Sequence, residues 1–424
     1  MIKFLFKGVI RDRSRSLLPV IVISIGVMLT VILYCWMKGI MGETITMNAN
    51  FNTGHLKIMT RAYVKDADQM PNDLALLDAN KLVKEVKDSF PDLDWVKRIR
   101  FGGLIDFPDS SGETRAQGPV IGWAIDLLTP GSKEIERFNI EKSIITGKMP
   151  AKPTEALITN DFAVKFKIKT GDKFTLFGTT MDGSMAFKNF IVSGTVRFGA
   201  AAMDRGAIII DIADAQEALS MDDAASEVLG FFNTGQFDQA KAETIKNTFN
   251  AKYAASKDEY APQMLTLRDQ SGMAELIDYV GEVSGVMIFI FILAMSVVLW
   301  NAGLIGSLRR YNEFGVRLAL GEGKNGIYKT IIYEGILVGL IGTITGTILG
   351  VAFSYLLEKV GLNIGGMMKN SSLMMPAIAR AVVTPTAYYI GLIPGLLSML
   401  LGSALAGLGI YKRKTAQLFK ELEV

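Results

Sequence analysis

Four long stretches without a charged residue constrain this chain of 424 residues more than any other feature. One lies near the start and the others lie near the end, at 17–37, 283–308, 335–357 and 381–411. Because a helix rises about 1.5 Å per residue, about 20 apolar residues cross a hydrocarbon core of roughly 30 Å. Pro385 interrupts the last stretch, so we expect that span to start near Thr386. The sequence therefore predicts a membrane protein with a four-helix transmembrane bundle.

The first stretch has a rival interpretation as a cleavable signal peptide, because several basic residues precede it within 1–16. Its apolar part exceeds the roughly 7–15 residues of such a peptide, and no small-x-small cleavage site follows it. We therefore expect an uncleaved anchor.

Basic residues beside the apolar stretches indicate the orientation. They are dense in the leader, at 309–310 after the second stretch, and at 412–414 after the fourth. Such flanks stay on the cytoplasmic side of a membrane. We expect both termini in the cytoplasm (N-in, C-in), in the inner membrane of the cell, with 38–282 and 358–380 outside.

Composition excludes several classes of function. The formal net charge of +3 is small, and the basic residues flank the spans, which argues against a nucleic-acid partner. A single histidine, His55, is too few for most histidine-based metal sites. The glycine-rich run before Lys324 is not a P-loop, because Asn325 follows it and Leu318 stands where its first glycine belongs. The spans also lack the ionisable residues of ion-driven carriers. We expect a chain with no catalytic, metal or cofactor site, powered by another chain.

The large segment between the first two spans has the pattern of an α+β domain. A strand at 54–59, a helix after a cap at Asn72 and a strand at 95–107 form one strand-helix-strand unit. A strand at 227–232, a helix through 237–253 and a strand at 263–267 form a second. We expect the two units to share one mixed sheet.

Residues 109–222 between these units read as a β-rich insertion. A hairpin is predicted over 165–176 around a turn at 170–172, and a strand at 205–212 precedes a short helix at 214–219. From 270 to 282, apolar residues keep helical spacing into the second span, which predicts a helical stalk.

The predicted parts follow in chain order. They are the leader 1–16, first span and stalk 17–44, first sheet part 45–108, insertion 109–222, second sheet part 223–268, stalk and second span 269–308, cytoplasmic loop 309–334, third span 335–357, outer loop 358–385, fourth span 386–411 and tail 412–424.

The loop after the second span carries a motif. It runs from Arg309-Arg310 through Glu313-Phe314-Gly315 to Ala319-Leu320-Gly321. This motif, together with the order of apolar stretches along the chain, resembles FtsX-like ABC transporter permeases of the lipoprotein-releasing LolC and LolE type. The pattern of that family is basic residues, then Glu-apolar-Gly, then Ala-apolar-Gly. An arginine common before the alanine is replaced here by Leu318, with Arg317 one step earlier.

This resemblance implies a coupling loop that contacts an ATPase. Its residues would be Glu313, Phe314, Gly315, Val316, Arg317, Ala319, Leu320 and Gly321. The domain between the first two spans would be a strand-helix-strand porter module with an inserted sabre module, like the periplasmic domain of MacB. The implied partners are two ABC ATPase subunits that hold ATP and Mg, a second permease copy, identical or paralogous, a periplasmic carrier or lipoprotein, and membrane lipids.

Three functions stay open at this point. The first is a permease subunit that releases lipoproteins by mechanotransmission, and the second is a MacB-like exporter of peptides or drugs. The third is an FtsX-like regulator of an extracytoplasmic hydrolase or sensor. In each, the chain itself is not an enzyme.

The residues of the loop also predict a short amphipathic helix starting near Asn312. It would present Phe314, Val316 and Leu320 to the membrane or to a partner, while Gly315 and Gly321 allow close approach and a turn. A helix that only lies at the membrane interface is the alternative.

Small residues form a stripe on the third span. Its members are Gly335, Gly339, Gly342, Gly346 and Gly350. Such spacing lets helices pack closely, either within one subunit or at a dimer seam. In the outer loop, methionines at 367, 368, 374 and 375 predict an apolar patch.

Overall fold

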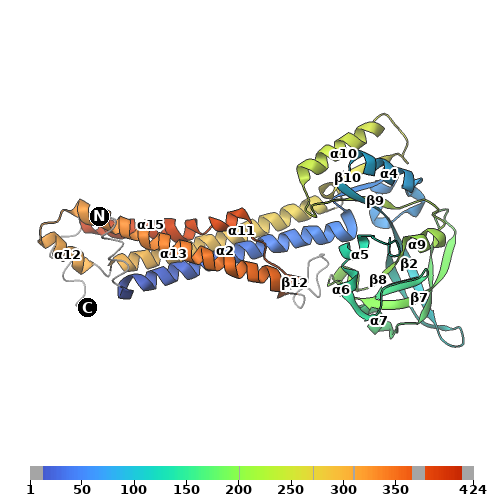
Figure 1. Ribbon diagram of the computed structural model, residues 1–424, viewed down its shortest axis with the longest axis horizontal. Helices are drawn as coiled ribbons and strands as arrows, with labels where there is room; N and C mark the ends of the chain where they lie inside the picture. The colour runs from blue at the N-terminus through green and yellow to red at the C-terminus, as the bar shows by residue number, and fades with distance from the viewer. Residues whose placement is uncertain (1–12, 200, 271, 309–310, 365–377, 413–424) are drawn as a thin grey trace. The chain divides into compact units, whose positions relative to one another are not determined.

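The computed structural model describes residues 13–199, 201–270, 272–308, 311–364 and 378–412 (Figure 1). It divides into two compact units. Of the described residues, the helical unit contains those within 13–42, 279–363 and 378–412. The sheet unit contains Glu43–Asp278. The predicted methionine patch lies outside the described residues.

All four predicted stretches lie in helices that are long and apolar enough to cross a membrane. The first is in α2 (Arg13–Asn48), the second in α11 (Met273–Leu308) and the third in α13 (Lys324–Val360). The fourth consists of short turns η5 (Pro385–Tyr388) and η6 (Ile393–Leu397) followed by α15 (Ser398–Lys412). The third helix begins at Lys324, so part of the predicted loop 309–334 is helical.

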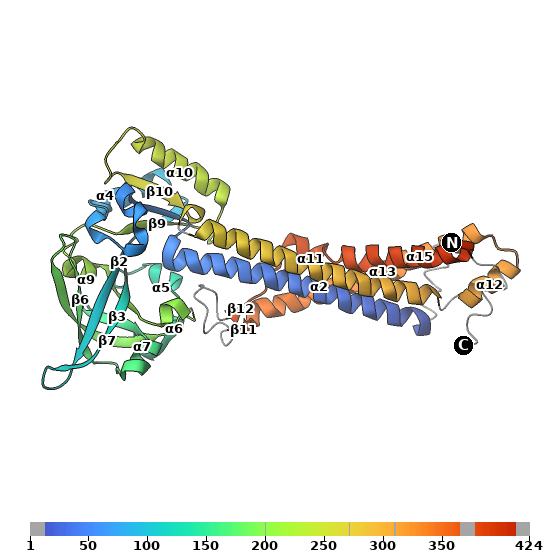
Figure 2. The same cartoon turned by 180° about the vertical axis from the view of Figure 1, so that it is seen from behind.

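The helices α2, α11, α13 and α15 run side by side in both views (Figure 1 and Figure 2). The glycine stripe explains how closely α13 packs. Gly335 and Gly339 face α15 and η6, while Gly342, Gly346 and Gly350 face α2. A Cβ at Gly346 would lie 2.5 Å from the backbone oxygen of Ser24. All five glycines are buried, so packing within one subunit accounts for the stripe.

The segment 378–382, which precedes η5, lies against α2. Strands β11 (Leu362–Asn363) and β12 (Ile378–Ala379) pair antiparallel. The N–H of Val382 then donates to the Cys35 carbonyl at 2.9 Å. This approach depends on Gly39, because a Cβ there would lie 1.9 Å from the backbone oxygen of Arg380.

In the sheet unit, the two predicted strand-helix-strand units form one sheet in the order β10-β1-β9-β2. These strands are Pro262–Thr266, Leu56–Thr60, Glu227–Phe232 and the first part of Leu93–Pro108. Every neighbouring pair is antiparallel, so the prediction of a mixed sheet is wrong for this part. Helices α4 (Ala79–Ser89) and α10 (Gln239–Tyr253) bury an apolar cluster against one face, which contains Ile58, Trp95 and Phe249.

The predicted helix cap at Asn72 is also wrong. Asn72–Leu74 is a single 3-10 turn, and α4 begins at Ala79. The side chain of Asn72 is bound elsewhere, because its Nδ2 donates to the Arg100 carbonyl at 3.0 Å and its Oδ1 accepts from Ser226 at 2.6 Å. These bonds point the side chain of Asn72 at β2 and Ser226, and no helix starts directly after Asn72 for it to cap.

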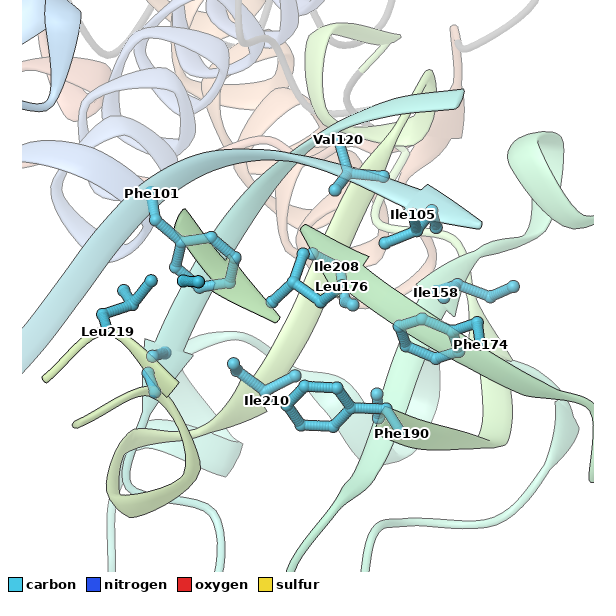
Figure 3. Close-up of a cluster of buried hydrophobic side chains, with 14 of the residues drawn as sticks. Phe101, Ile105, Val120, Ile158, Phe174, Leu176, Phe190, Ile208, Ile210 and Leu219 are labelled. Atoms are coloured by element: carbon cyan, nitrogen blue, oxygen red, sulfur yellow. The ribbon is translucent and has the colours of Figure 1, made fainter. Parts of the chain in front are cut away.

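The insertion forms a closed barrel. The second half of β2 pairs with β3 (Thr114–Ile125), and pairing continues through β8 (Ala207–Asp211), β5 (Glu155–Thr159), β7 (Met185–Val196) and β6 (Lys173–Thr179) back to β2. Apolar side chains from all these strands fill the interior, as expected for a barrel this small (Figure 3). Strand β4 (Ile144–Gly147) pairs antiparallel with the last residues of β7. Because β2 belongs to the sheet and to the barrel, it joins both parts.

The predicted hairpin over 165–176 is wrong in its first half. Residues Asn160–Phe166 form helix α7, because Phe162 and Phe166 pack together over Gly118 of β3. The later predictions are confirmed, since β8 is followed by α9 (Ile212–Ala218). The remaining short helices are α3 (Arg61–Lys65), η2 (Ala67–Gln69), α5 (Glu134–Arg137), α6 (Ile140–Ser143), α8 (Ala201–Asp204) and η4 (Leu267–Asp269).

Candidate functional site

The helix predicted near Asn312 is present as α12, which spans Tyr311–Ala319. It ends in a Schellman cap, in which the N–H of Glu322 donates to the Arg317 carbonyl at 3.0 Å. Gly321 forms the turn with a φ of +94°, a conformation that glycine adopts without steric cost. The loop is therefore a defined helix-turn-helix with α13.

The apolar residues of α12 divide into two groups. Phe314 is 2 % exposed and packs against Ile327 and Ile331 of α13, with Leu318 partly buried beside them. The prediction that Phe314 faces a partner or the membrane is wrong, because the return of α13 covers it. Val316 and Leu320 are 49 % and 82 % exposed.

A two-pronged ion pair fixes the turn after α12. Arg317 donates from Nε and Nη2 to the carboxylate of Glu322, at 2.6 and 2.7 Å. The arginine that stands one step early in the motif thus pairs within the loop itself. Of the other predicted loop residues, Glu313 is half-buried, Gly315 is buried and Ala319 is exposed. Arg309 and Arg310 lie outside the described residues.

A second candidate site lies in the sheet unit, where α2 ends. After Asn48 the chain makes one π-helical turn, η1 (Ala49–Thr53), and the carbonyls at such an end need donors from elsewhere. Arg98 Nη1 donates to the Asn50 carbonyl at 2.7 Å. Trp123 Nε1 donates to the Phe51 carbonyl at 3.1 Å. The end of the helix is therefore bonded to β2 and to β3.

The segment before α11 supplies a further donor. Gln270 Nε2 donates to the Thr53 carbonyl at 2.9 Å. Ala49, Leu267 and Met273 form a small buried cluster beside it. Side chains from separate parts of the fold thus hold the last turn.

Arg98 is held by a buried ionic cluster. Its Nε and Nη2 donate to Glu134 at 2.6 and 3.1 Å, and both side chains are 0 % exposed. Glu134 also accepts from Arg137 at 2.9 Å, and Arg137 pairs with Asp94. We call Arg98, Glu134, Arg137 and Asp94 the Arg98 cluster. Such a geometry satisfies the charges that burial would otherwise penalise.

Aromatic rings enclose this cluster. The guanidinium of Arg98 lies 4.7 Å from the ring centre of Phe138 and 5.6 Å from that of Phe231. Beside the cluster, Lys57 of β1 pairs with Glu227 of β9 at 2.5 Å, and burial lowers the pKa of the lysine. Motifs and local periodicity did not mark these residues as a site. The available signal was that Lys57, Arg98 and Glu227 each place a charge in a predicted strand.

The single histidine is structural. His55 is 3 % exposed, and its Nδ1 accepts from the N–H of Phe232 at 3.0 Å. Burial, with a smaller effect from Arg137, lowers the pKa of His55 to about 4. In the ranges that the structure describes, no group of three or more His, Cys, Asp or Glu side chains could hold a metal ion.

This pKa predicts acid sensitivity of the sheet unit. The unfolded histidine titrates near 6.5, so between pH 6.5 and about 4 the unfolded chain binds more protons than the folded one. The contribution of neutral His55 to the free energy of unfolding is complete above pH 6.5 and is lost as the pH falls toward 4, by up to about 1.4 kcal/mol per pH unit. His55→Asn retains an acceptor for Phe232 but does not titrate. Hydrogen exchange of β9 peptides in the detergent-solubilised chain is expected to show a shallower pH slope in this variant, and equal slopes would contradict the assignment.

Parts of the chain are similar to known proteins. Residues 285–415 match a family model described as FtsX-like permease C-terminal. Proteins of Xylella fastidiosa named lipoprotein-releasing system transmembrane protein LolC are similar over 264 residues, at 23% identity in strain 9a5c and 22% in strain Temecula1. Each match covers 61% of this chain and 56% of the relative, so the chain spans about half the length of these relatives.

A solved structure is also similar. The periplasmic region of MacB from Actinobacillus actinomycetemcomitans matches with a TM-score of 0.34 at 8% identity. The match covers 52% of this chain and 91% of that structure.

Proposed function

We propose that this chain, which carries an FtsX-like permease domain over residues 285–415, is the membrane subunit of an ATP-driven ABC transporter that works by mechanotransmission. In this proposal, two separate ATPase subunits hold ATP and Mg, and this chain supplies no catalytic group. A second permease, identical or paralogous, completes the membrane part.

The observation that carries the proposal is α12. This helix lies within the matched domain, its turn is fixed by Arg317 and Glu322, and it leaves Val316 and Leu320 exposed. Exposed apolar side chains on a short, fixed helix suit docking into a groove of another protein. The four candidate spans support a multi-pass protein of the inner membrane. With basic residues beside the spans, we assign the N-in, C-in orientation, which puts α12 in the cytoplasm and the sheet unit outside.

For the cargo, we propose lipoproteins that leave the membrane for a periplasmic carrier. The names of the LolC relatives support this choice. The test is ATP-driven release of a triacylated lipoprotein from proteoliposomes that contain the permease and its ATPase. Release to a soluble acceptor is expected. Efflux of peptides or drugs without lipoprotein release would favour the exporter, and activation of a cell-wall hydrolase alone would favour the regulator.

The docking role of α12 predicts a loss of ATPase binding in Val316→Asp/Leu320→Asp. Both side chains are exposed, so the fold is expected to survive, while charges in an apolar contact are expected to lower ATPase co-purification by about tenfold or more. The matched control is Leu77→Asp, which changes a leucine of the sheet unit that is 60 % exposed. Undiminished ATPase recovery with the double variant would contradict the proposed docking surface.

A further inference from the structure

We propose that Arg98 is the positioning residue through which α2 moves the sheet unit, so that the Arg98 cluster serves as a stiff link. This inference rests on the proposed function, in which movement of the spans must reach the sheet unit. Its basis is the bonding of the last turn of α2, described within the sheet unit alone.

Arg98 attaches the end of α2 to a strand that belongs to both parts of the sheet unit. Arg98 bonds the Asn50 carbonyl at the end of α2, and it lies on β2. Residues 93–98 of β2 pair with β9, and residues 99–108 pair with β3. Arg98 therefore stands at the point where the strand passes from the antiparallel sheet into the barrel. A displacement of the helix end at this point reaches both parts together.

The side chain of Arg98 is held rigidly by its neighbours. The guanidinium of Arg98 has its donors committed to Glu134 and to the helix carbonyl, and it lies close to the rings of Phe138 and Phe231. A planar fork held on several sides has little freedom to rotate. Glu134 is fixed in turn by Arg137. No exposed flexible side chain takes part in the contact between Arg98 and the helix end.

The start of α11 differs from the end of α2, because its ion pair is exposed. The ion pair near the start of α11, Arg268 with Asp278, is 36 % and 54 % exposed. Gly272, just before α11, has a φ of +71°, and nothing lies within 4 Å of a Cβ added there. Exposed pairs contribute little to rigidity because water competes for them. Both α2 and α11 have one end in the sheet unit. The end of α2 is held there by a buried ionic cluster, whereas the start of α11 is held by the apolar cluster of Ala49, Leu267 and Met273 and by an exposed ion pair.

The test replaces the link while keeping its volume. Arg98→Met/Glu134→Met exchanges the buried ion pair for apolar side chains, a change that buried pairs often tolerate. Arg137 keeps Asp94 as a partner. The matched control is Arg197→Met/Asp161→Met, which removes an exposed pair of the same unit. A second variant, Arg98→Lys, keeps the charge but loses the fork, so the link is still tested if the double variant does not fold.

Two readouts separate a mechanical role from a structural one. The first is the amount of lipoprotein released per ATP hydrolysed in proteoliposomes, which is expected to fall about tenfold in the double variant and less in Arg98→Lys. The second is the distance between spin labels at the exposed positions Thr46 and Glu136, with the buried Cys35 replaced by alanine. The distance distribution is expected to broaden in both variants and to stay narrow in the control.

Unchanged release per ATP together with an unchanged distance distribution would overturn the inference. A wild-type chain that recruits no ATPase would contradict the proposed function instead. In that case the spin-label distances alone would test the inference, because their measurement needs no ATPase. A narrow distance distribution in both variants would overturn the inference.

Discussion

Gly39→Val is expected to prevent correct assembly of the helical unit, whereas Gly42→Val, on the same helix, is expected to be tolerated. A Cβ at Gly39 would lie 1.9 Å from the backbone oxygen of Arg380, and no rotamer change relieves a clash with backbone. At Gly42 nothing lies within 4 Å of the added atom. Both variants replace a glycine by valine in the same helix, so the effect of the substitution on helix propensity is the same in both. We expect a difference of about 3 kcal/mol or more in favour of Gly42→Val.

The measurement is the fraction of each variant that is monodisperse after detergent extraction, followed by its thermal unfolding. The clash would also break the bond from Val382 to the Cys35 carbonyl, so faster hydrogen exchange at Val382 is expected in Gly39→Val alone. Equal behaviour of the two variants would contradict the packing of 380–382 on α2.

Arg98→Ala is expected to destabilise the sheet unit by about 3–5 kcal/mol. The substitution leaves Glu134, which is 0 % exposed, with Arg137 as its remaining cation, and Arg137 is already shared with Asp94. A buried carboxylate that loses its two-pronged partner is costly. The substitution also leaves the Asn50 carbonyl without its Arg98 donor. Arg98→Met/Glu134→Met removes both charges and is expected to cost far less, because no lone charge remains. If the two substitutions acted independently, the double variant would lose more stability than Arg98→Ala, whereas we expect it to lose less.

Denaturation followed by hydrogen exchange of β2 and β9 peptides measures this loss. Arg197→Ala serves as control, since the pair of Arg197 with Asp161 is exposed and such pairs contribute about 1 kcal/mol or less. A loss in Arg98→Ala no larger than in this control would show that the buried pair has no structural role.

Local patterns predict much of the helical unit and of the antiparallel sheet. Uncharged runs of sufficient length predict all four candidate spans. Strand β9 and the long strand β2 lie where alternation and β-branched residues predict them. The helix α12 follows from its amphipathic spacing and from Gly321 at its end. In each case the signal lies within a few neighbouring residues.

The errors have a common cause. Asn72 resembles a helix cap, but Ser226 and Arg100 occupy its side chain from distant strands. Phe314 resembles a docking residue, but α13 returns to cover it. Residues 165–166 resemble a strand, but the last turn of α7 packs on Gly118. Each depends on a partner in another element of the fold, which local periodicity does not encode.

By itself, the sequence determined that the chain has four candidate spans and a large α+β segment, because the signals for a spanning helix and for a strand lie in hydrophobicity and periodicity over short windows. Only the tertiary structure decided that the insertion closes into a barrel on β2 and that Arg98 caps α2 from a fully buried position. Closure and burial depend on strand pairing between distant segments, and the charge on Arg98 is tolerable only where Glu134 meets it.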